Sequence, residues 1–504
     1  MEKTYSDEIY QVEPIFDYAS IRVPDRVSAL EVHNQLIPIT PFTPDLDVTI
    51  RPLAYNHDEQ NKLKRGFLKL DKGTLNPLFA HGGYTYSAPN YFNISAHGGY
   101  DYRDETSTPN KLVRDIEGHL DIDYYLNKEL KSSLTVGYNR SSYGLYANPL
   151  LEQESQLGYD DIEVGLGLES IRTTPDHWNY RGHVQLETWN SRTTETKERT
   201  VSSLGELSYM INNTWDISLS PEVRWTQSEV LGDNTSLHGS LNISLDQSKF
   251  YANTGIRIDR YNDETRLWPD VDLRWKTQEG VDIYIRSEAS ADLWGGRYIT
   301  EINPYASFQN LNSDNRTLVY TRSIQSKIDA KLPNQFDLVF STSFADTRDD
   351  LNFIRSDEER EIFEIEEVDY QRLSITADIA RPLISGLIIP GLLLRYDRYD
   401  VKSGRLYNRP TFLIKPHIDS KLLSDKLSIG IEGLFHNAVV YQETTDTEIT
   451  SGWRTQLSAQ ISYQLLDVLS IQLDADNILA DDFELWQGYD VFGRNLSAGV
   501  LFKF

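Results

Sequence analysis

The sequence predicts an all-β protein, a transmembrane antiparallel β-barrel of about 22 strands, within a range of about 18 to 22. Three observations predict this fold. Apolar and polar side chains alternate along many short segments, no apolar run is long enough for a spanning helix, and tight turns alternate with longer loops. We expect the tight turns on the periplasmic side and the longer loops on the extracellular side, as in bacterial outer-membrane barrels.

The alternation is clearest in residues 161–169 and 453–465. In the first segment Ile, Val and Leu alternate with Asp, Glu and Gly; in the second, Trp, Leu, Ile and Tyr lie opposite Arg, Gln and Ser. Successive side chains of a strand point to opposite faces, so each segment has one apolar and one polar face. A soluble β-sandwich also alternates, but here strand follows strand from about residue 65 to the end without a helical stretch, which favours the barrel.

The aromatic content also favours a barrel. Only 39% of the residues are hydrophobic, yet the chain has 30 Tyr, 18 Phe and 9 Trp. A barrel needs apolar residues only at alternate positions, and it places aromatic side chains at both membrane interfaces. The longest apolar run, residues 383–394, contains Ser, Gly and Pro and is shorter than the roughly 20 residues that a spanning helix needs.

Charge and cysteine content argue against several functions. The net charge of −27 disfavours nucleic-acid binding, which needs Lys and Arg to neutralise phosphates. The chain has no Cys, which excludes thiol catalysis and thiolate metal sites. The sequence contains no Gly-x-Ser-x-Gly motif, no P-loop and no His pair at helical metal-binding spacing. We therefore expect neither an enzyme nor a bound cofactor or metal.

Two regions are expected. Residues 1–64 contain many prolines and no sustained alternation, which predicts an extended segment that lies at the rim, in the lumen or against a partner. Residues 65–504 are expected to form the barrel. The first residues lack the apolar core of a secretory signal, so we expect a mature form of the chain. Longer extracellular loops are expected around 147–159, 295–314, 349–366 and 481–490.

The last strand carries a predicted outer-membrane assembly signal. Its apolar face ends in an aromatic residue at the final position and comprises Leu496, Ala498, Val500, Phe502 and Phe504. A terminal alternating strand that ends in Phe resembles the signal that the outer-membrane assembly machinery recognises.

A short sequence is repeated near the start of the barrel. Residues 80–84, Ala-His-Gly-Gly-Tyr, recur at residues 96–100. The repeat predicts two nearby strands with small inward residues where another group approaches closely. The alternative is a ligand site that uses both His81 and His97.

The polar faces contain many carboxylates, which we expect to line the lumen. A lumen lined by carboxylates would favour cations. These residues are Asp115, Glu117, Asp121, Asp123, Asp161 and Glu163.

The C-terminal region resembles the end of TonB-dependent receptor barrels. The residues that carry the resemblance are Asn477, Gly488, Tyr489, Gly493 and Arg494, together with the closing Phe504. The N-terminal third, with its Pro-rich leader, is similar to a Bacteroidota-type subgroup of such proteins that lacks the N-terminal plug. The resemblance implies a location in the outer membrane of a Gram-negative bacterium, in contact with outer-membrane lipid.

Three functions remain open from the sequence. The favoured hypothesis is a partly filled barrel that acts in an envelope complex for transport, secretion or outer-membrane assembly, with surface lipoproteins or other envelope barrels as partners. One alternative is a passive, cation-preferring, porin-like channel. The other is a TonB-type transporter whose plug is supplied by a second chain.

The terminal strand gives a first prediction. Replacing Phe504 with Asp should lower the amount of barrel assembled in the membrane more than it lowers the stability of barrel already folded, because the residue acts in recognition. Quantitative blots of the heat-modifiable form, compared with thermal unfolding of purified protein, measure the two effects. An unchanged level of assembled Phe504→Asp protein would show that the strand is not a recognition signal.

Overall fold

The computed structural model describes residues 65–88, 91–147, 155–171, 177–229, 231–261, 264–277, 280–308, 318–356, 362–384, 386–403, 405–444, 447–481 and 483–504. The leader expected at residues 1–64 lies outside this part of the chain. Within the described ranges, none of the helices has the length and apolar character needed to span a membrane.

Twenty-two strands form one sheet. The first eleven are β1 (Gly66–Gly73), β2 (Leu78–Ala88), β3 (Phe92–Asp104), β4 (Leu112–Tyr125), β5 (Leu130–Gly144), β6 (Gln156–Ser170), β7 (Trp178–Ser191), β8 (Lys197–Met210), β9 (Trp215–Ser228), β10 (Gly232–Gln247) and β11 (Phe250–Tyr261). The others are β12 (Glu264–Lys276), β13 (Val281–Leu293), β14 (Leu318–Leu332), β15 (Phe336–Arg355), β16 (Phe363–Ala380), β17 (Ile388–Ser403), β18 (Phe412–Leu422), β19 (Leu427–His436), β22 (Arg454–Leu466), β23 (Leu469–Asp476) and β26 (Asn495–Lys503).

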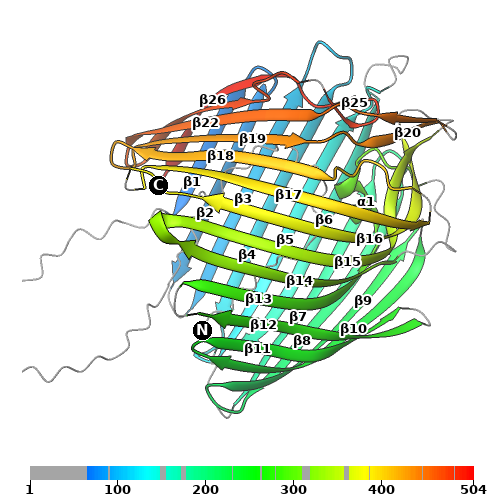
Figure 1. Ribbon diagram of the computed structural model, residues 1–504, viewed down its shortest axis with the longest axis vertical. Helices are drawn as coiled ribbons and strands as arrows, with labels where there is room; N and C mark the ends of the chain where they lie inside the picture. Colours follow the sequence, from blue (N-terminus) through cyan, green and yellow to red (C-terminus); the bar gives the residue numbers. More distant parts are fainter. Residues whose placement is uncertain are drawn as a thin grey trace, which may run out of the picture.

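The sheet closes on itself. Each strand is antiparallel to its neighbours along the chain, and β1 pairs with β26 from Phe67↔Lys503 to Gly73↔Ser497. Figure 1 shows the resulting barrel, with the C-terminus on the side of the short turns. The prediction of an antiparallel barrel of about 22 strands is confirmed.

Smaller elements occupy the end of the barrel with the longer loops. They are the hairpins β20 (Val440–Thr444) with β21 (Thr447–Thr450) and β24 (Glu484–Trp486) with β25 (Tyr489–Asp490), and the helix α1 (Gly296–Ile302). A short 3-10 turn, Pro333–Gln335, lies at the other end. One expected loop was placed wrongly: most of residues 349–366 continues β15 and β16, with a bulge in the pairing between Thr347 and Asp350.

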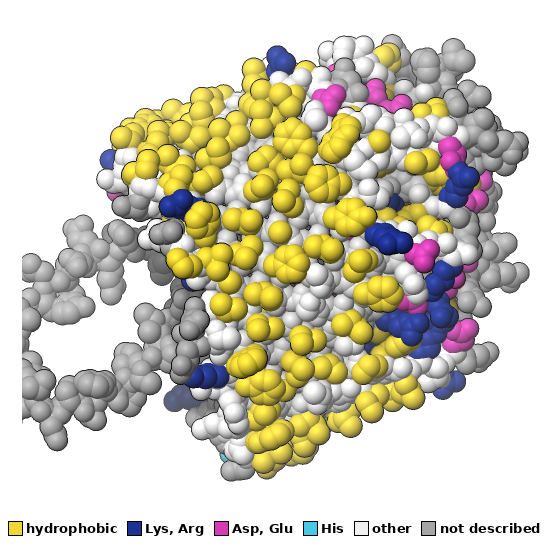
Figure 2. All heavy atoms as spheres, in the orientation of Figure 1, with side chains coloured by type: hydrophobic (Ala, Val, Ile, Leu, Met, Phe, Trp, Pro, Cys, Tyr) yellow, Lys and Arg dark blue, Asp and Glu magenta, His cyan; other side chains and the backbone are white. Residues whose placement is uncertain are grey.

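The two faces of the wall follow the alternation in the sequence. The large apolar side chains Leu166, Ile256 and Ile324 are 60%, 58% and 60% exposed, because they point outward where lipid would cover them. Figure 2 shows such side chains spread over the outer surface as an apolar belt. The intervening positions point into the lumen.

The repeated Ala-His-Gly-Gly-Tyr sequence has a steric explanation. The two copies lie on neighbouring strands in antiparallel register, so that His81 faces Gly99 and His97 faces Gly83. A Cβ atom on Gly99 would lie 2.4 Å from the His81 ring. The glycine thus makes room for an imidazole that lies against the wall. The expectation of adjacent strands with small inward residues is confirmed.

The assignment of the two faces gives a second prediction. Ile461 lies near the middle of β22 and points outward, whereas Gln460 next to it points into the lumen and lies opposite Asp474. Ile461→Lys should lower the free energy of unfolding by about 2–4 kcal/mol, the cost of a cation near the bilayer midplane. Gln460→Lys is the matched control and should cost far less, because its ammonium group meets water and a carboxylate. Unfolding titrations in lipid vesicles measure both, and equal losses would contradict the assignment.

Candidate functional site

Two segments fold back from the loop end into the barrel. They are residues 294–308, which contain α1, and residues 477–494, which contain β24 and β25; we call them together the loop cluster. Their apolar side chains pack against apolar residues of the wall in one buried group. Its members are Leu157, Tyr159, Trp189, Leu231, Trp294, Ile299, Tyr305, Ala306, Phe308, Val319, Leu351, Phe353, Phe363, Trp486 and Tyr489.

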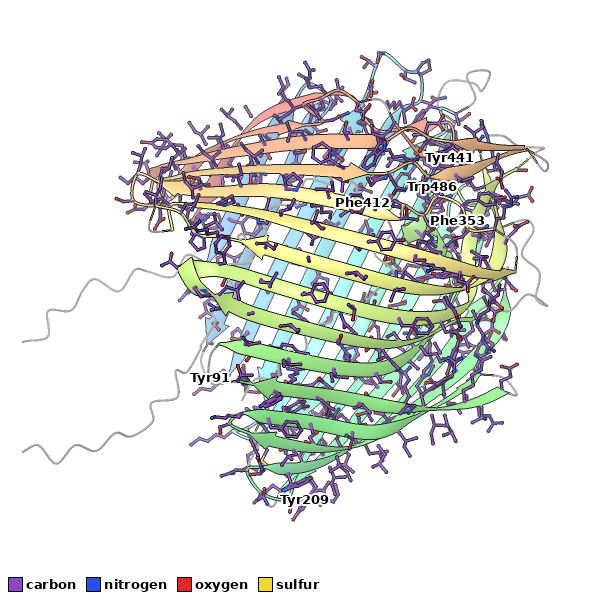
Figure 3. All side chains as sticks on the ribbon, viewed as in Figure 1. Tyr91, Tyr209, Phe353, Phe412, Tyr441 and Trp486 are labelled. Carbon is purple, nitrogen blue, oxygen red and sulfur yellow. The ribbon has the colours of Figure 1, made fainter. Side chains whose placement is uncertain are left out.

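Aromatic rings hold the two segments together. Tyr305 from the first segment stacks on Tyr489 from the second, with ring centroids 3.5 Å apart and an angle of 15° between the planes. Trp486 packs against the wall residues Phe353 and Phe363, with centroids 5.3 and 5.6 Å away. Figure 3 shows Trp486, Phe353 and Tyr441 close together at the loop end. Burial of such rings is strongly favourable.

Wall side chains satisfy the backbone of the loop cluster. The hydroxyl groups of Tyr159 and Tyr146 donate hydrogen bonds of 2.7 Å to the carbonyl oxygens of Pro304 and Asp490. The Lys111 ammonium donates to the carbonyl oxygen of Val491, also at 2.7 Å. Because buried backbone groups need partners, these bonds stabilise the segments inside the barrel mouth.

Arg297 anchors α1 to the lumen wall through carboxylates. Its guanidinium lies 3.3 Å from Asp161, 3.8 Å from Glu163 and 3.1 Å from Glu187, and 3.0 Å from Glu301 on its own helix. Burial by itself would lower the pKa of Arg297, but the surrounding carboxylates raise it above its usual value. Two of the six acidic residues singled out in the sequence thus bind a positive side chain of the loop cluster.

Three more of those acidic residues also have basic neighbours. Glu117 lies 3.3 Å from His81, Asp121 lies 3.1 Å from His119, and Asp123 lies 3.6 Å from Lys131. These carboxylates, like Asp161 and Glu163, alternate with outward apolar residues and so face the lumen. Lys131 thus compensates the charge of Asp123, whereas the two histidines compensate Glu117 and Asp121 only when they are protonated.

The sixth acidic residue, Asp115, lines a cavity beneath the second segment of the loop cluster. The cavity has a volume of about 260 Å³ and lies between residues 483–493 and the wall, where Asp115 and Tyr146 border it. Nearby, Glu105 accepts hydrogen bonds from Lys111 and from the backbone N–H of Gly493. Burial would raise the pKa of Glu105, but these two partners hold it below its usual value.

The family-like C-terminal residues build this second segment. Asn477 has a positive φ of 47° and donates from its amide to the carbonyl oxygen of Phe492. Gly488 has a φ of 82° in the turn between β24 and β25, a conformation that glycine adopts without strain. Tyr489 is 1% exposed, and the N–H of Gly493 donates to Glu105, whereas Arg494 is exposed.

Sequence reasoning missed the aromatic contacts of the loop cluster. Phe483, Trp486 and Tyr489 are large apolar residues in a segment expected to be a solvent-exposed loop. Exposed loops rarely carry such a density of aromatic side chains. That density was the available signal that the loop folds inward.

Comparisons with known proteins identify the fold. No protein-family model and no curated protein sequence matches the chain. Among solved structures, the siderophore receptor PirA from Acinetobacter baumannii has a TM-score of 0.68 at 11% identity, over 88% of this chain and 80% of that chain. A variant of the ferric enterobactin receptor PfeA from Pseudomonas aeruginosa has a TM-score of 0.67 at 10% identity, over 88% and 80%.

A third similar structure is the complex of FpvAI with pyocin S2, with a TM-score of 0.62 at 9% identity, over 88% of this chain and 73% of that chain. This fold is the 22-stranded barrel of TonB-dependent siderophore receptors. At these identities the likeness shows the fold alone, and the outer membrane of a Gram-negative bacterium stays the location that the sequence predicts.

The aromatic contacts give a third prediction. Tyr489→Ala removes the ring stacked on Tyr305 and should cost the loop cluster about 3 kcal/mol of local stability. Amides of residues 477–494 should then exchange with solvent faster. The matched control is Trp453→Ala at the same end of the barrel, where the ring is 58% exposed. Hydrogen exchange measured by mass spectrometry compares the two variants, and equal exchange in both would show that the stack does not hold the cluster.

Proposed function

We propose that this protein is an outer-membrane transport barrel whose lumen is closed on the extracellular side by its own loop cluster. Opening it then requires partner proteins of the envelope. The observation that carries the proposal is the packing of residues 294–308 against residues 477–494 inside the barrel mouth. The likeness to receptor barrels supports transport as the general function.

The energetics of the loop cluster support a closed resting state. Fully burying one large apolar side chain is worth about 1.5–3 kcal/mol. Opening the mouth would expose several such side chains, among them Trp486, Tyr489 and Ile299, and would also break the contacts of Arg297. Spontaneous opening is therefore rare, and a partner or cargo must supply binding energy that favours the open form.

The porin-like alternative has less support. A cation-preferring pore needs carboxylates that act on passing ions, but Asp123 is paired with Lys131, and Glu117 and Asp121 contact the imidazoles of His81 and His119. Asp161 and Glu163 contact Arg297 of the loop cluster itself. The lumen wall thus uses its negative charge to hold internal structure.

The proposal gives a fourth prediction, tested by conductance in planar bilayers. The intact protein should show rare, small openings. Replacing residues 294–317 with a short Gly-Ser linker should produce a large, steady conductance, because the linker cannot fill the mouth. The matched control replaces residues 192–196, a short turn between β7 and β8 at the same end that contributes no residue to the buried group, and it should conduct like the intact protein.

The results separate the candidate functions. A large conductance of the intact protein would contradict closure and favour the porin-like channel. The role of partners needs a second measurement, affinity purification of the intact protein from native membranes at several salt concentrations. Recovery of the barrel alone under all conditions would contradict the envelope complex.

A further inference from the structure

Backbone pairing between the neighbouring strands β12 and β13 covers only part of their length. Register partners of β12 and β13 run only from Val271↔Ser287 to Lys276↔Asp282. In the described chain, residues 264–270 of β12 pair with β11 but have no register partner on β13. A seam without backbone pairing is unusual in a barrel, where pairing normally runs around the whole wall.

Side chains from both sides bridge this seam. The Trp268 ring of β12 lies 5.2 Å from the Tyr320 ring of β14. The guanidinium of Arg322 lies 5.1 Å from the Trp268 ring, and that of Arg266 lies 4.2 Å from the Tyr320 ring. A cavity of about 250 Å³ remains beside these rings; we call it the seam pocket. It is lined by Arg266, Leu267, Trp268, Tyr320, Arg322, Asp346 and Arg348.

The seam pocket opens on the outer face of the barrel. Arg322 lies two residues before the outward Ile324 on β14. Asp346 and Arg348 lie two and four residues after the outward Phe344 on β15, so these side chains share the outward face. Figure 2 shows Lys and Arg side chains gathered at the loop end of the apolar belt. Arg322, Asp346 and Arg348 therefore lie on the outer face, whereas Arg266 and Trp268 alternate with the outward Leu267 and reach the pocket from the lumen side of β12.

Its depth matches the headgroup region of the outer leaflet. The outward apolar positions of β14 run from Leu332 to Ile324. With a rise of about 3.4 Å per residue and a tilt of about 40°, this stretch spans about 20 Å of a belt that is about 25 Å tall. Arg322, two residues further, lies where the acyl chains end and lipid headgroups begin.

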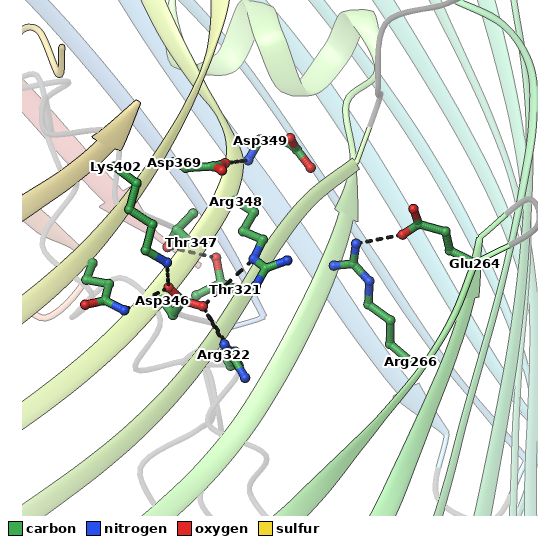
Figure 4. Close-up of polar contacts among 11 residues, drawn as sticks. Glu264, Arg266, Thr321, Arg322, Asp346, Thr347, Arg348, Asp349, Asp369 and Lys402 are labelled. Atoms are coloured by element: carbon green, nitrogen blue, oxygen red, sulfur yellow. Dashed lines mark hydrogen bonds and ion pairs between the residues drawn. The ribbon is translucent and has the colours of Figure 1, made fainter. Parts of the chain in front are cut away.

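Positive charge exceeds negative charge in the pocket lining. Three arginines face one carboxylate, Asp346. That carboxylate already accepts a 2.7 Å hydrogen bond from Arg322 and contacts Lys402 of β17, both drawn in Figure 4. Arg348 reaches Asp346 only at 4.0 Å. Arg266 pairs with Glu264 at the exposed edge.

We propose that the seam pocket binds the phosphate group of a phosphorylated glycolipid in the outer leaflet. Arg322 and Arg348, each about half exposed, would donate charge-assisted hydrogen bonds to the phosphate oxygens. The outward-facing Leu267, 64% exposed, would contact the acyl chains. Such a lipid also covers the seam, where the wall lacks backbone pairing.

A purely structural role accounts for less of the geometry. Exposed ion pairs contribute little to stability, and Asp346, which already contacts Arg322 and Lys402, lies 4.0 Å from Arg348. Three guanidinium groups around one pocket at headgroup depth are better explained by an anionic ligand that arrives from the membrane.

The test uses the full chain, purified in detergent and stripped of lipid. Native mass spectrometry follows binding of lipid A, of the same lipid without its phosphates, and of inorganic phosphate. The variant is Arg322→Gln with Arg348→Gln. The matched control is Lys197→Gln with Arg199→Gln, which removes two exposed cations from the outward face of β8 at the same end. Circular dichroism and heat-modifiable migration verify that each variant is folded.

The pocket variant should bind lipid A about a hundred- to ten-thousandfold more weakly, the loss expected for two hydrogen bonds to a charged group, whereas the control should bind like the intact protein. Equal binding by the pocket variant, or equal binding of the lipid without phosphate, would overturn the proposal. Binding of inorganic phosphate as tight as that of lipid A would assign the pocket to a soluble anion instead. If the pocket variant does not fold, the intact protein decides: its affinity for lipid A must fall as salt is raised, and a constant affinity refutes the site.

Discussion

In a bilayer every backbone N–H and C=O group must find a partner within the protein, and the rest of this structure depends on how the sheet meets that constraint. The sheet closes where β1 pairs with β26. The closure is stabilised on both faces. Outside, Phe504 stacks near Tyr84 and Phe502; inside, the buried Lys69 lies 3.0 Å from Asp71 and 4.0 Å from Asp474 across β26.

Closure with 22 strands has a second consequence, because the diameter of a barrel grows with its strand number. Wall side chains cannot meet across so wide a lumen, so other parts of the chain must fill it. The loop cluster fills the extracellular end with the aromatic pair Tyr305 and Tyr489. Arg297 brings a positive charge to the acidic wall. The polar face that lines the lumen thus also supplies the carboxylates that hold the loop cluster in place.

The sequence predicts those features that local alternation encodes. Residues 161–169 and 454–465 lie in strands with the expected outward faces, since one side of a strand must meet lipid. The inward fold of the loops was not predictable in this way. The contacts of Tyr305 with Tyr489 and of Arg297 with Asp161 join segments far apart in the chain. A local sequence pattern cannot predict contacts between such distant segments. For the same reason the acidic residues were identified but their basic partners were not.

The lumen and the outer face are mechanically connected through β13. This strand has lost half of its pairing to β12, and after Leu293 it runs directly into Trp294 and α1. A strand held along only one edge costs less to displace than one paired on both sides, and local opening begins where such contacts are fewest. A ligand that covers the seam would therefore also stabilise the end of β13, from which residues 294–308 of the loop cluster begin. If a ligand bound at the seam stiffens β13, linkage requires that this ligand and a partner acting on the loop cluster influence each other's affinity.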